Sequence, residues 1–228
     1  MDVILKLVKN IITIDGPSGV GKGTLAFSLA ERLGWNVLDS GLLYRLVGYL
    51  SFEDGLDTTR EIVQFLKKSK IKLITNLNES ICEIELNDKI LGKELRNENI
   101  ASRASILAKD AEIRSAIIKI QRDAYDSEKG LIADGRDMGT IIFPEAALKV
   151  FLQASPEVRA ERRANQLKEK DMSVIMHDLL EQIQQRDKED INRKISPLKP
   201  ADDSLVIDTS NLSIKEVEEK VMENYKKL

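Results

Sequence analysis

The hydrophobic positions of the chain alternate between short β-branched runs and longer segments with helical spacing. Three segments, LAFSLAERL, AEIRSAIIKIQRDAY and SVIMHDLLEQIQQRDKED, place apolar residues three or four positions apart, which is typical of helices. Strands that alternate with helices predict an α/β fold with a central five-stranded parallel sheet flanked by helices, and with ligands at the carboxyl ends of its strands. Five apolar runs predict these strands: Ile11 to Asp15, Trp35 to Leu38, Leu131 to Asp134, a run from Leu148 and a run ending at Asp208.

One segment, Ile71 to Ile90, breaks this alternation. It contains two β-patterned runs separated by an Asn-rich turn, and Asn87 with Asp88 gives a further turn signal. We therefore expect a small antiparallel β insert in an otherwise parallel α/β domain.

Length and composition agree with one domain of this class. A chain of 228 residues with 42% hydrophobic content can bury a substantial core, and its net charge of −3 gives no general attraction for nucleic acid. The single cysteine, Cys82, excludes an internal disulfide and is interpreted as a packing residue. With one histidine, His177, the composition also excludes triad hydrolysis and His or Cys metal sites.

The chain shows no signal for secretion or membrane insertion. Its first residues, MDVILKLVK, are too few and too charged for a signal peptide, and no apolar run reaches membrane length. We expect a soluble cytoplasmic protein, with no membrane or nucleic-acid partner.

The stretch GPSGVGKGT, residues 16 to 24, follows the first predicted strand and precedes the first predicted helix. Its glycines permit positive φ and let backbone N–H groups turn toward phosphate oxygens, and Lys22 supplies an ammonium group for the β and γ phosphates. Gly23 stands where Ser or Thr usually follows the lysine, so the Thr24 hydroxyl becomes the candidate ligand for Mg²⁺. The predicted ATP-binding residues are Gly16, Pro17, Ser18, Gly19, Val20, Gly21, Lys22, Gly23 and Thr24.

Polar motifs follow two further strands. The first, DSGLLYR at residues 39 to 45, is explained equally well by an Asp or Ser helix N-cap. The second, DGRDMGT at residues 134 to 140, begins with Asp134, which closes an apolar strand as a metal-associated aspartate would. A surface turn would explain the glycines, but it would not require the opposite charges of Arg136 and Asp137.

Two arginine-rich helical segments lie in the second half of the chain. In SPEVRAERRANQLKEK, Ser155 caps a helix that Pro156 begins, and the segment is either a solvated helix or a mobile lid. In QRDKEDINR, Arg186, Asp190 and Arg193 form either a salt-bridged solvent face or one side of a pocket.

Five motifs in this order, GPSGVGKGT, LDSGLLYR, GLIADGRDMGT, VFLQASPEVRAERR and QRDKEDINRKISPL, closely resemble those of bacterial cytidylate kinases. The resemblance implies the P-loop nucleoside monophosphate kinase fold as a single kinase domain over residues 1–228. It divides this domain into a core of residues 1–60, 96–154 and 190–228, an NMP-binding insert of about residues 61–95 and a lid of about residues 155–172.

The resemblance also implies roles for individual residues. It assigns the acceptor phosphate to Ser40, Arg45 and Arg136, the cytosine to Ser105, Arg114, Asp137 and Arg193, and the sugar to Arg186 and Asp190. Mg²⁺ is expected at the Thr24 hydroxyl, with Asp134 acting through water. The residues expected to act in catalysis are Lys22, Arg136, Asp137, Arg159 and Arg163.

The activity implied is Mg²⁺-dependent transfer of phosphate from ATP to CMP and dCMP, which releases ADP, by a monomeric enzyme. Two polyanions must be brought together, so positioning and charge neutralisation matter more than acid–base groups. Kinases for UMP, AMP or shikimate are alternatives that share the loop but are not expected to combine GRDMGT with RDKEDINR. A P-loop ATPase or GTPase switch is another alternative, although the chain has no NKxD motif for guanine.

Overall fold

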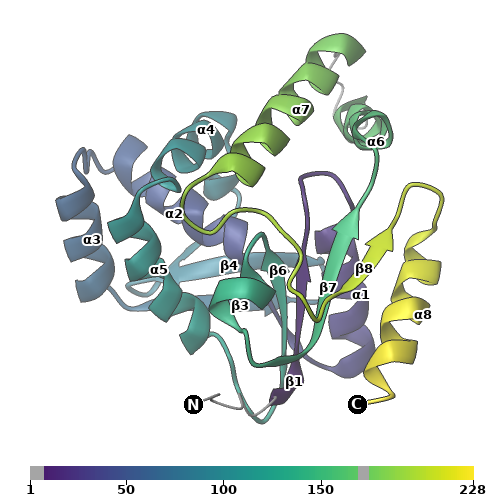
Figure 1. Cartoon of the computed structure of the whole chain (residues 1–228). Helices are drawn as coiled ribbons and strands as arrows, with labels where there is room; N and C mark the ends of the chain where they lie inside the picture. The colour runs from purple at the N-terminus through teal and green to yellow at the C-terminus, as the bar shows by residue number, and fades with distance from the viewer. Residues whose placement is uncertain (1–7, 169–174) are drawn as a thin grey trace. The chain divides into compact units, whose positions relative to one another are not determined.

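The computed structural model describes residues 8–168 and 175–228 (Figure 1). The strand order is β2-β6-β1-β7-β8 in a five-stranded sheet and β3-β4-β5 in a three-stranded sheet. The five-stranded parallel sheet predicted from the sequence is therefore confirmed. The tertiary contacts divide the chain into two compact units. The first unit consists of the described residues up to Ser28 together with those of Gly135–Leu228, and the second unit is Leu29–Asp134.

The first unit is built on three parallel strands, β1 (Val8–Asp15), β7 (Ala146–Gln153) and β8 (Leu205–Asp208). β7 lies between the other two, with Ile12 opposite Leu148 and Val150 opposite Leu205. The isoleucines of β1 are almost completely buried, as expected for a strand covered on both faces. The predicted runs for these strands were correct in place, but β1 begins three residues and β7 two residues earlier than predicted.

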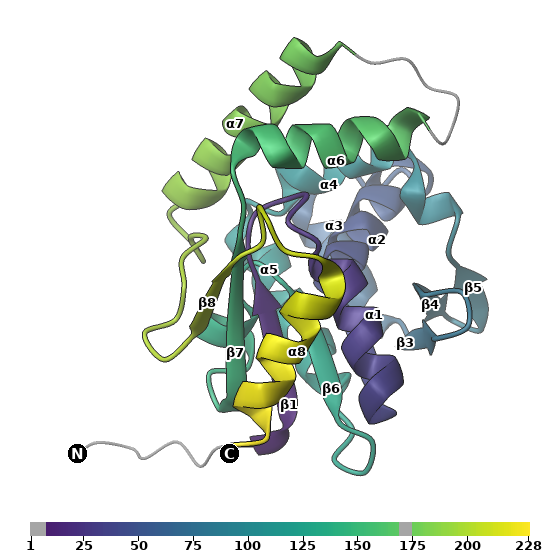
Figure 2. The same cartoon turned by 90° about the vertical axis from the view of Figure 1, so that its right-hand side faces the viewer.

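Helices α1 (Lys22–Leu33) and α8 (Ile214–Tyr225) pack in this unit, and the Ser28 hydroxyl donates a hydrogen bond to the Glu218 carboxylate. Figures 1 and 2 show α8 beside β8 and β7. Ser213 and Glu216 form a reciprocal capping box that begins α8, while Val217 and Val221 are buried.

Helices α6 (Pro156–Lys168) and α7 (Met176–Asn192) pack against each other through Ala160, Ala164, Leu179 and Ile183. Figure 2 shows α6 above the loop that follows β1. The segment predicted as a lid, about residues 155–172, contains α6, and its residues 169–172 lie outside the described residues.

The second unit contains β2 (Asn36–Asp39) and β6 (Leu131–Gly135), which pair in parallel and bring Asp39 opposite Asp134. Its helices are α2 (Ser40–Phe52), α3 (Thr59–Lys68), α4 (Glu98–Leu107) and α5 (Ala111–Asp123), which Figure 1 shows grouped together.

The insert is a three-stranded antiparallel sheet of β3 (Ile71–Asn76), β4 (Ile81–Leu86) and β5 (Lys89–Leu91). The antiparallel insert is confirmed, but β5 was not recognised as a strand because it is only three residues long. A short 3-10 helix, η1 (Glu94–Arg96), follows it.

Cys82 on β4 is buried, and its thiol donates to the Val37 carbonyl at 3.5 Å. Burial raises the pKa of Cys82 to about 12, so the thiol stays protonated at neutral pH, and the prediction of a packing role is confirmed.

A helix able to cross a lipid bilayer is not found in the part of the chain that the structure describes.

Candidate active site

The loop of residues 16 to 24 joins β1 to α1, as the sequence predicted. Gly16, Gly19 and Gly21 have φ values of 149°, 82° and 95°, which side chains rarely tolerate. A Cβ at Gly16 would also lie 2.2 Å from the Leu152 carbonyl oxygen. Gly23 differs from the other loop glycines, because it lies inside α1 and needs no positive φ.

Hydrogen bonds to three of its carbonyl oxygens hold this loop. Lys22 Nζ donates to Pro17 at 3.0 Å, Arg159 Nη1 to Ser18 at 3.2 Å, and Thr209 Oγ1 to Val20 at 3.2 Å. Thr209 was not predicted from its sequence context. The signal available in the sequence was its position directly after β8, where ligand-binding residues of parallel sheets gather.

Each of the two candidate metal-associated residues carries an oxygen donor of the kind that Mg²⁺ prefers, and each is described here within its own unit. Thr24 is exposed in the first turn of α1, and Asp134 stands at the end of β6 in the second unit. Among residues 8–168 and 175–228 there is no cluster of three His, Cys, Asp or Glu side chains suited to a metal. Mg²⁺ often uses one or two protein ligands together with substrate phosphates and water.

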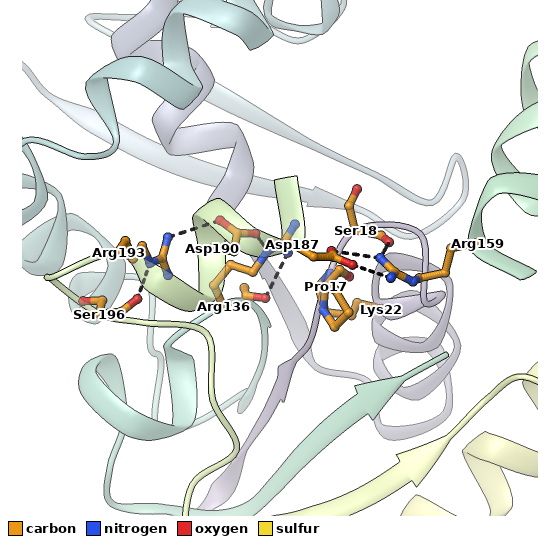
Figure 3. A network of polar contacts seen from close by, with 10 residues as sticks. Pro17, Ser18, Lys22, Arg136, Arg159, Asp187, Asp190, Arg193 and Ser196 are labelled. Carbon is orange, nitrogen blue, oxygen red and sulfur yellow. Dashed lines mark hydrogen bonds and ion pairs between the residues drawn. The ribbon is translucent and has the colours of Figure 1, made fainter. Parts of the chain in front are cut away.

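Asp190 lies among arginines near the C-terminal end of α7 (Figure 3). Its Oδ2 accepts a hydrogen bond from Arg136 Nε at 2.9 Å, and Arg193 Nη1 lies 3.7 Å from its Oδ1. Burial raises the pKa of Asp190, but the charges of Arg136, Arg193 and Arg186 more than offset this, so its pKa lies below the ordinary value. Asp190 and Arg193 are therefore not on a solvated face, whereas Arg186 is exposed.

Arg159 of α6 is buried, with 3% of its side chain exposed. Its guanidinium pairs with both oxygens of Asp187 on α7 and donates to the carbonyl of Ser18 (Figure 3). It also donates to the carbonyl of Ala154. The alternative of a solvated helix is thus wrong at Arg159, while Arg163 is half-buried. Asp187 was missed because an acidic residue beside Arg186 in a charged helix carries no signal of its partner.

Asp15, the last residue of β1, is a second residue that the sequence analysis missed. Its carboxylate accepts hydrogen bonds from the N–H groups of Met138 at 2.9 Å and Gly139 at 2.8 Å. Burial, despite these hydrogen bonds, raises the pKa of Asp15 to about 6, and the nearby Asp137 contributes in the same direction. Asp137 is itself buried, so the predicted Arg136–Asp137 pair is part of an interior turn.

The second unit positions other predicted residues. Ser40 is buried at the start of α2, which Asp39 caps by accepting a hydrogen bond from Leu42 N. The N-cap explanation of DSGLLYR is therefore correct for Asp39, without excluding a binding role for Ser40.

Arginines of this unit are held by backbone carbonyls. Arg45 Nη1 donates to Leu95 at 3.1 Å and Arg114 Nη1 to Ala108 at 3.2 Å. The Arg114 guanidinium also lies 5.3 Å from the centre of the Tyr44 ring. Ser105 is exposed on α4.

Comparison with known proteins connects this geometry with one family. The family model described as cytidylate kinase matches residues 12–227. A cytidylate kinase of Photobacterium profundum is 43% identical over 91% of this chain and 90% of its own length. One from Pseudomonas fluorescens (strain Pf0-1) is 45% identical over 93% of each chain. An uncharacterized protein from Eubacterium ventriosum ATCC 27560 shares the fold, with a TM-score of 0.53, 14% identity, and coverage of 96% of this chain and 99% of its own.

Proposed function

Because the chain belongs to the cytidylate kinase family, we propose that it transfers the γ-phosphoryl group of ATP to CMP or dCMP, with release of ADP. The observation that supports this most directly lies in the first unit. There a glycine-rich phosphate loop with a buried lysine occurs together with Arg136, Asp190 and Arg193, linked at the end of α7.

ATP is assigned to the loop. Its glycine conformations bring the backbone close to a bound phosphate, and Lys22 at the start of α1 offsets the negative charge of the β and γ phosphates. Mg²⁺ would be held by the Thr24 hydroxyl, with Asp134 acting through water, and would neutralise phosphate charge.

The contacts of the acceptor nucleotide are assigned residue by residue, on the family resemblance alone. Ser40, Arg45 and Arg136 are assigned to the acceptor phosphate. Arg186 and Asp190 would bind the sugar. Ser105, Arg114, Asp137 and Arg193 would read the cytosine, whose exocyclic amine donates and whose ring atoms accept hydrogen bonds.

These residues suit a reaction that needs no strong general base. The acceptor phosphate is largely ionised near neutral pH, so its oxygen can attack without losing a proton to the protein. Catalysis then depends on holding two polyanions in line and neutralising charge as the phosphoryl group moves. Arg159 and Arg163 of α6 are assigned to this neutralisation, and closure of α6 would exclude water and limit ATP hydrolysis. We propose that the enzyme acts as a monomer on free nucleotides of the cytoplasm.

The test is ADP release from Mg-ATP with CMP, dCMP, UMP, AMP, GMP or shikimate as the acceptor. Turnover confined to CMP and dCMP is expected. Fast turnover with another acceptor would leave the assignment of ATP to the phosphate loop unchanged, but it would rule out the residues assigned to cytosine. ATP hydrolysis that proceeds without any acceptor would instead favour a P-loop ATPase or GTPase switch.

Asp190→Ala is expected to change kcat/KM for CMP and dCMP by different factors, because these substrates differ only at the 2′ position of the sugar. Steady-state kinetics with both substrates measures the difference, and Lys188→Ala, an exposed neighbour on α7, is the control. Equal losses for the two substrates would restrict Asp190 to holding Arg136, with which it shares the 2.9 Å hydrogen bond.

A further inference from the structure

Asp15 connects the phosphate loop with residues 136–139, which we call the Arg136 turn. Its two carboxylate oxygens each accept one backbone hydrogen bond, from Met138 N at 2.9 Å and from Gly139 N at 2.8 Å. We call these two hydrogen bonds the Asp15 bridge. Asp15 is 4% exposed, so water does not readily replace either bond.

Each end of the Asp15 bridge is adjacent in the sequence to one part of the site. Asp15 precedes Gly16, the first residue of the loop, and Met138 follows Asp137. Met138 also begins the π-helical turn η2 (Met138–Ile142), and Asp137 accepts the N–H groups of Ile141 and Ile142 through its carbonyl. The carboxylate of Asp15 therefore satisfies N–H groups at the open beginning of this turn.

The turn is packed closely where the bridge forms. A Cβ added at Gly139 would lie 2.8 Å from Thr13 Oγ1 and 3.2 Å from the Lys149 side chain. Only glycine lets this backbone approach β1 without displacing these atoms. Position 15 has the complementary requirement, because it must supply two acceptors within a buried space.

We propose that Asp15 is a positioning residue for phosphoryl transfer, which holds the Arg136 turn at a fixed place relative to the phosphate loop and Lys22. This inference rests on the proposed function, since it assumes that Lys22 acts on the donor phosphates and Arg136 on the acceptor phosphate. The bridge acts on the alignment of the two nucleotides. Each nucleotide retains its own contacts when the bridge is broken, so turnover is affected more than binding.

Asp15→Asn tests the bridge at nearly constant side-chain size. The amide keeps one acceptor oxygen but presents its NH₂ group to the second backbone N–H. We expect kcat to fall by about 10- to 100-fold, while KM for ATP and for CMP changes by less than about threefold. Gly139→Ala provides a second variant that leaves Asp15 intact, and the same division between kcat and KM is expected from it.

Loss of stability alone must be separated from loss of alignment. Val221→Ala removes two methyl groups from a fully buried position in α8, far from the turn in sequence, and is the control for destabilisation. All variants are assayed well below their unfolding midpoints. Equal loss of kcat in Val221→Ala would assign the effect of Asp15→Asn to stability and overturn the inference.

A double-mutant cycle with Arg136→Ala supplies the readout that a structural role would not change. If Asp15 acts through the Arg136 turn, Asp15→Asn in the Arg136→Ala background lowers kcat by less than about threefold. If Asp15→Asn lowers kcat in the Arg136→Ala enzyme by the same factor as in the wild type, the inference is contradicted. An Asp15→Asn enzyme with wild-type kcat would contradict it as well. A wild-type protein that transfers nothing to CMP would instead refute the proposed function on which the inference depends.

Discussion

Replacing Lys22 with alanine is expected to lower kcat with CMP by about 100- to 1,000-fold. Lys22 begins α1, and its ammonium donates to the Pro17 carbonyl within the phosphate loop. In the proposed reaction it neutralises negative charge on the transferring phosphoryl group and on the leaving ADP, which no neighbouring side chain of the loop can supply. Rapid-quench or coupled-enzyme measurement of ADP formation gives the change in kcat.

The fold should tolerate this change. Lys22 is at a helix terminus, where alanine is an excellent helix former, so circular dichroism and the thermal midpoint should stay close to those of the wild type. Lys220→Ala in α8, an exposed lysine, is the matched control and should retain full turnover. Near-normal turnover of the Lys22→Ala enzyme would remove this residue from the mechanism.

Replacing Asp187 with alanine is expected to lower the free energy of unfolding by about 3 to 5 kcal/mol. The change leaves the Arg159 guanidinium buried with only 3% of its side chain exposed and without its carboxylate partner. The carbonyls of Ser18 and Ala154 remain as acceptors, but neutral oxygens do not replace the lost charge. Urea unfolding followed by fluorescence or circular dichroism measures the difference.

Two comparisons make this prediction specific to the buried pair. Glu181→Ala breaks the exposed contact between His177 and Glu181 on the same helix and should cost less than about 1 kcal/mol. Arg159→Met combined with Asp187→Ala removes both charges and should recover part of the lost stability. If Asp187→Ala destabilises the protein no more than Glu181→Ala does, the buried pair does not stabilise the packing of α6 on α7.

A stability effect at Asp187 would also reach the nucleotide site. Arg159 donates to the Ser18 carbonyl, so the same guanidinium contributes to both the packing of α6 against α7 and the conformation of the phosphate loop. We therefore expect the Asp187→Ala enzyme to bind ATP more weakly than the wild type at temperatures where both are folded.

The features that the sequence alone determined are those with a local physical signal. Buried β-branched runs such as Ile11 to Asp15 indicated the parallel strands, because a strand covered on both faces is mostly apolar. The glycine spacing of residues 16 to 24 indicated the phosphate loop, because positive φ at Gly16, Gly19 and Gly21 is required by the backbone itself. The antiparallel insert followed from period-two patterning and turn residues, although the three residues of β5 were too few to register.

Only the tertiary structure decided which charged residues are paired and buried. Asp190 bonds to Arg136, 54 positions away, and Asp187 to Arg159, 28 positions away, while the same helix also presents exposed charges such as Glu181. An Asp in a charged helix looks the same in sequence whether its partner is water or an arginine of another element. Asp15 is the clearest case, because its partners are backbone N–H groups of Met138 and Gly139, and backbone groups have no side-chain identity that a sequence could display.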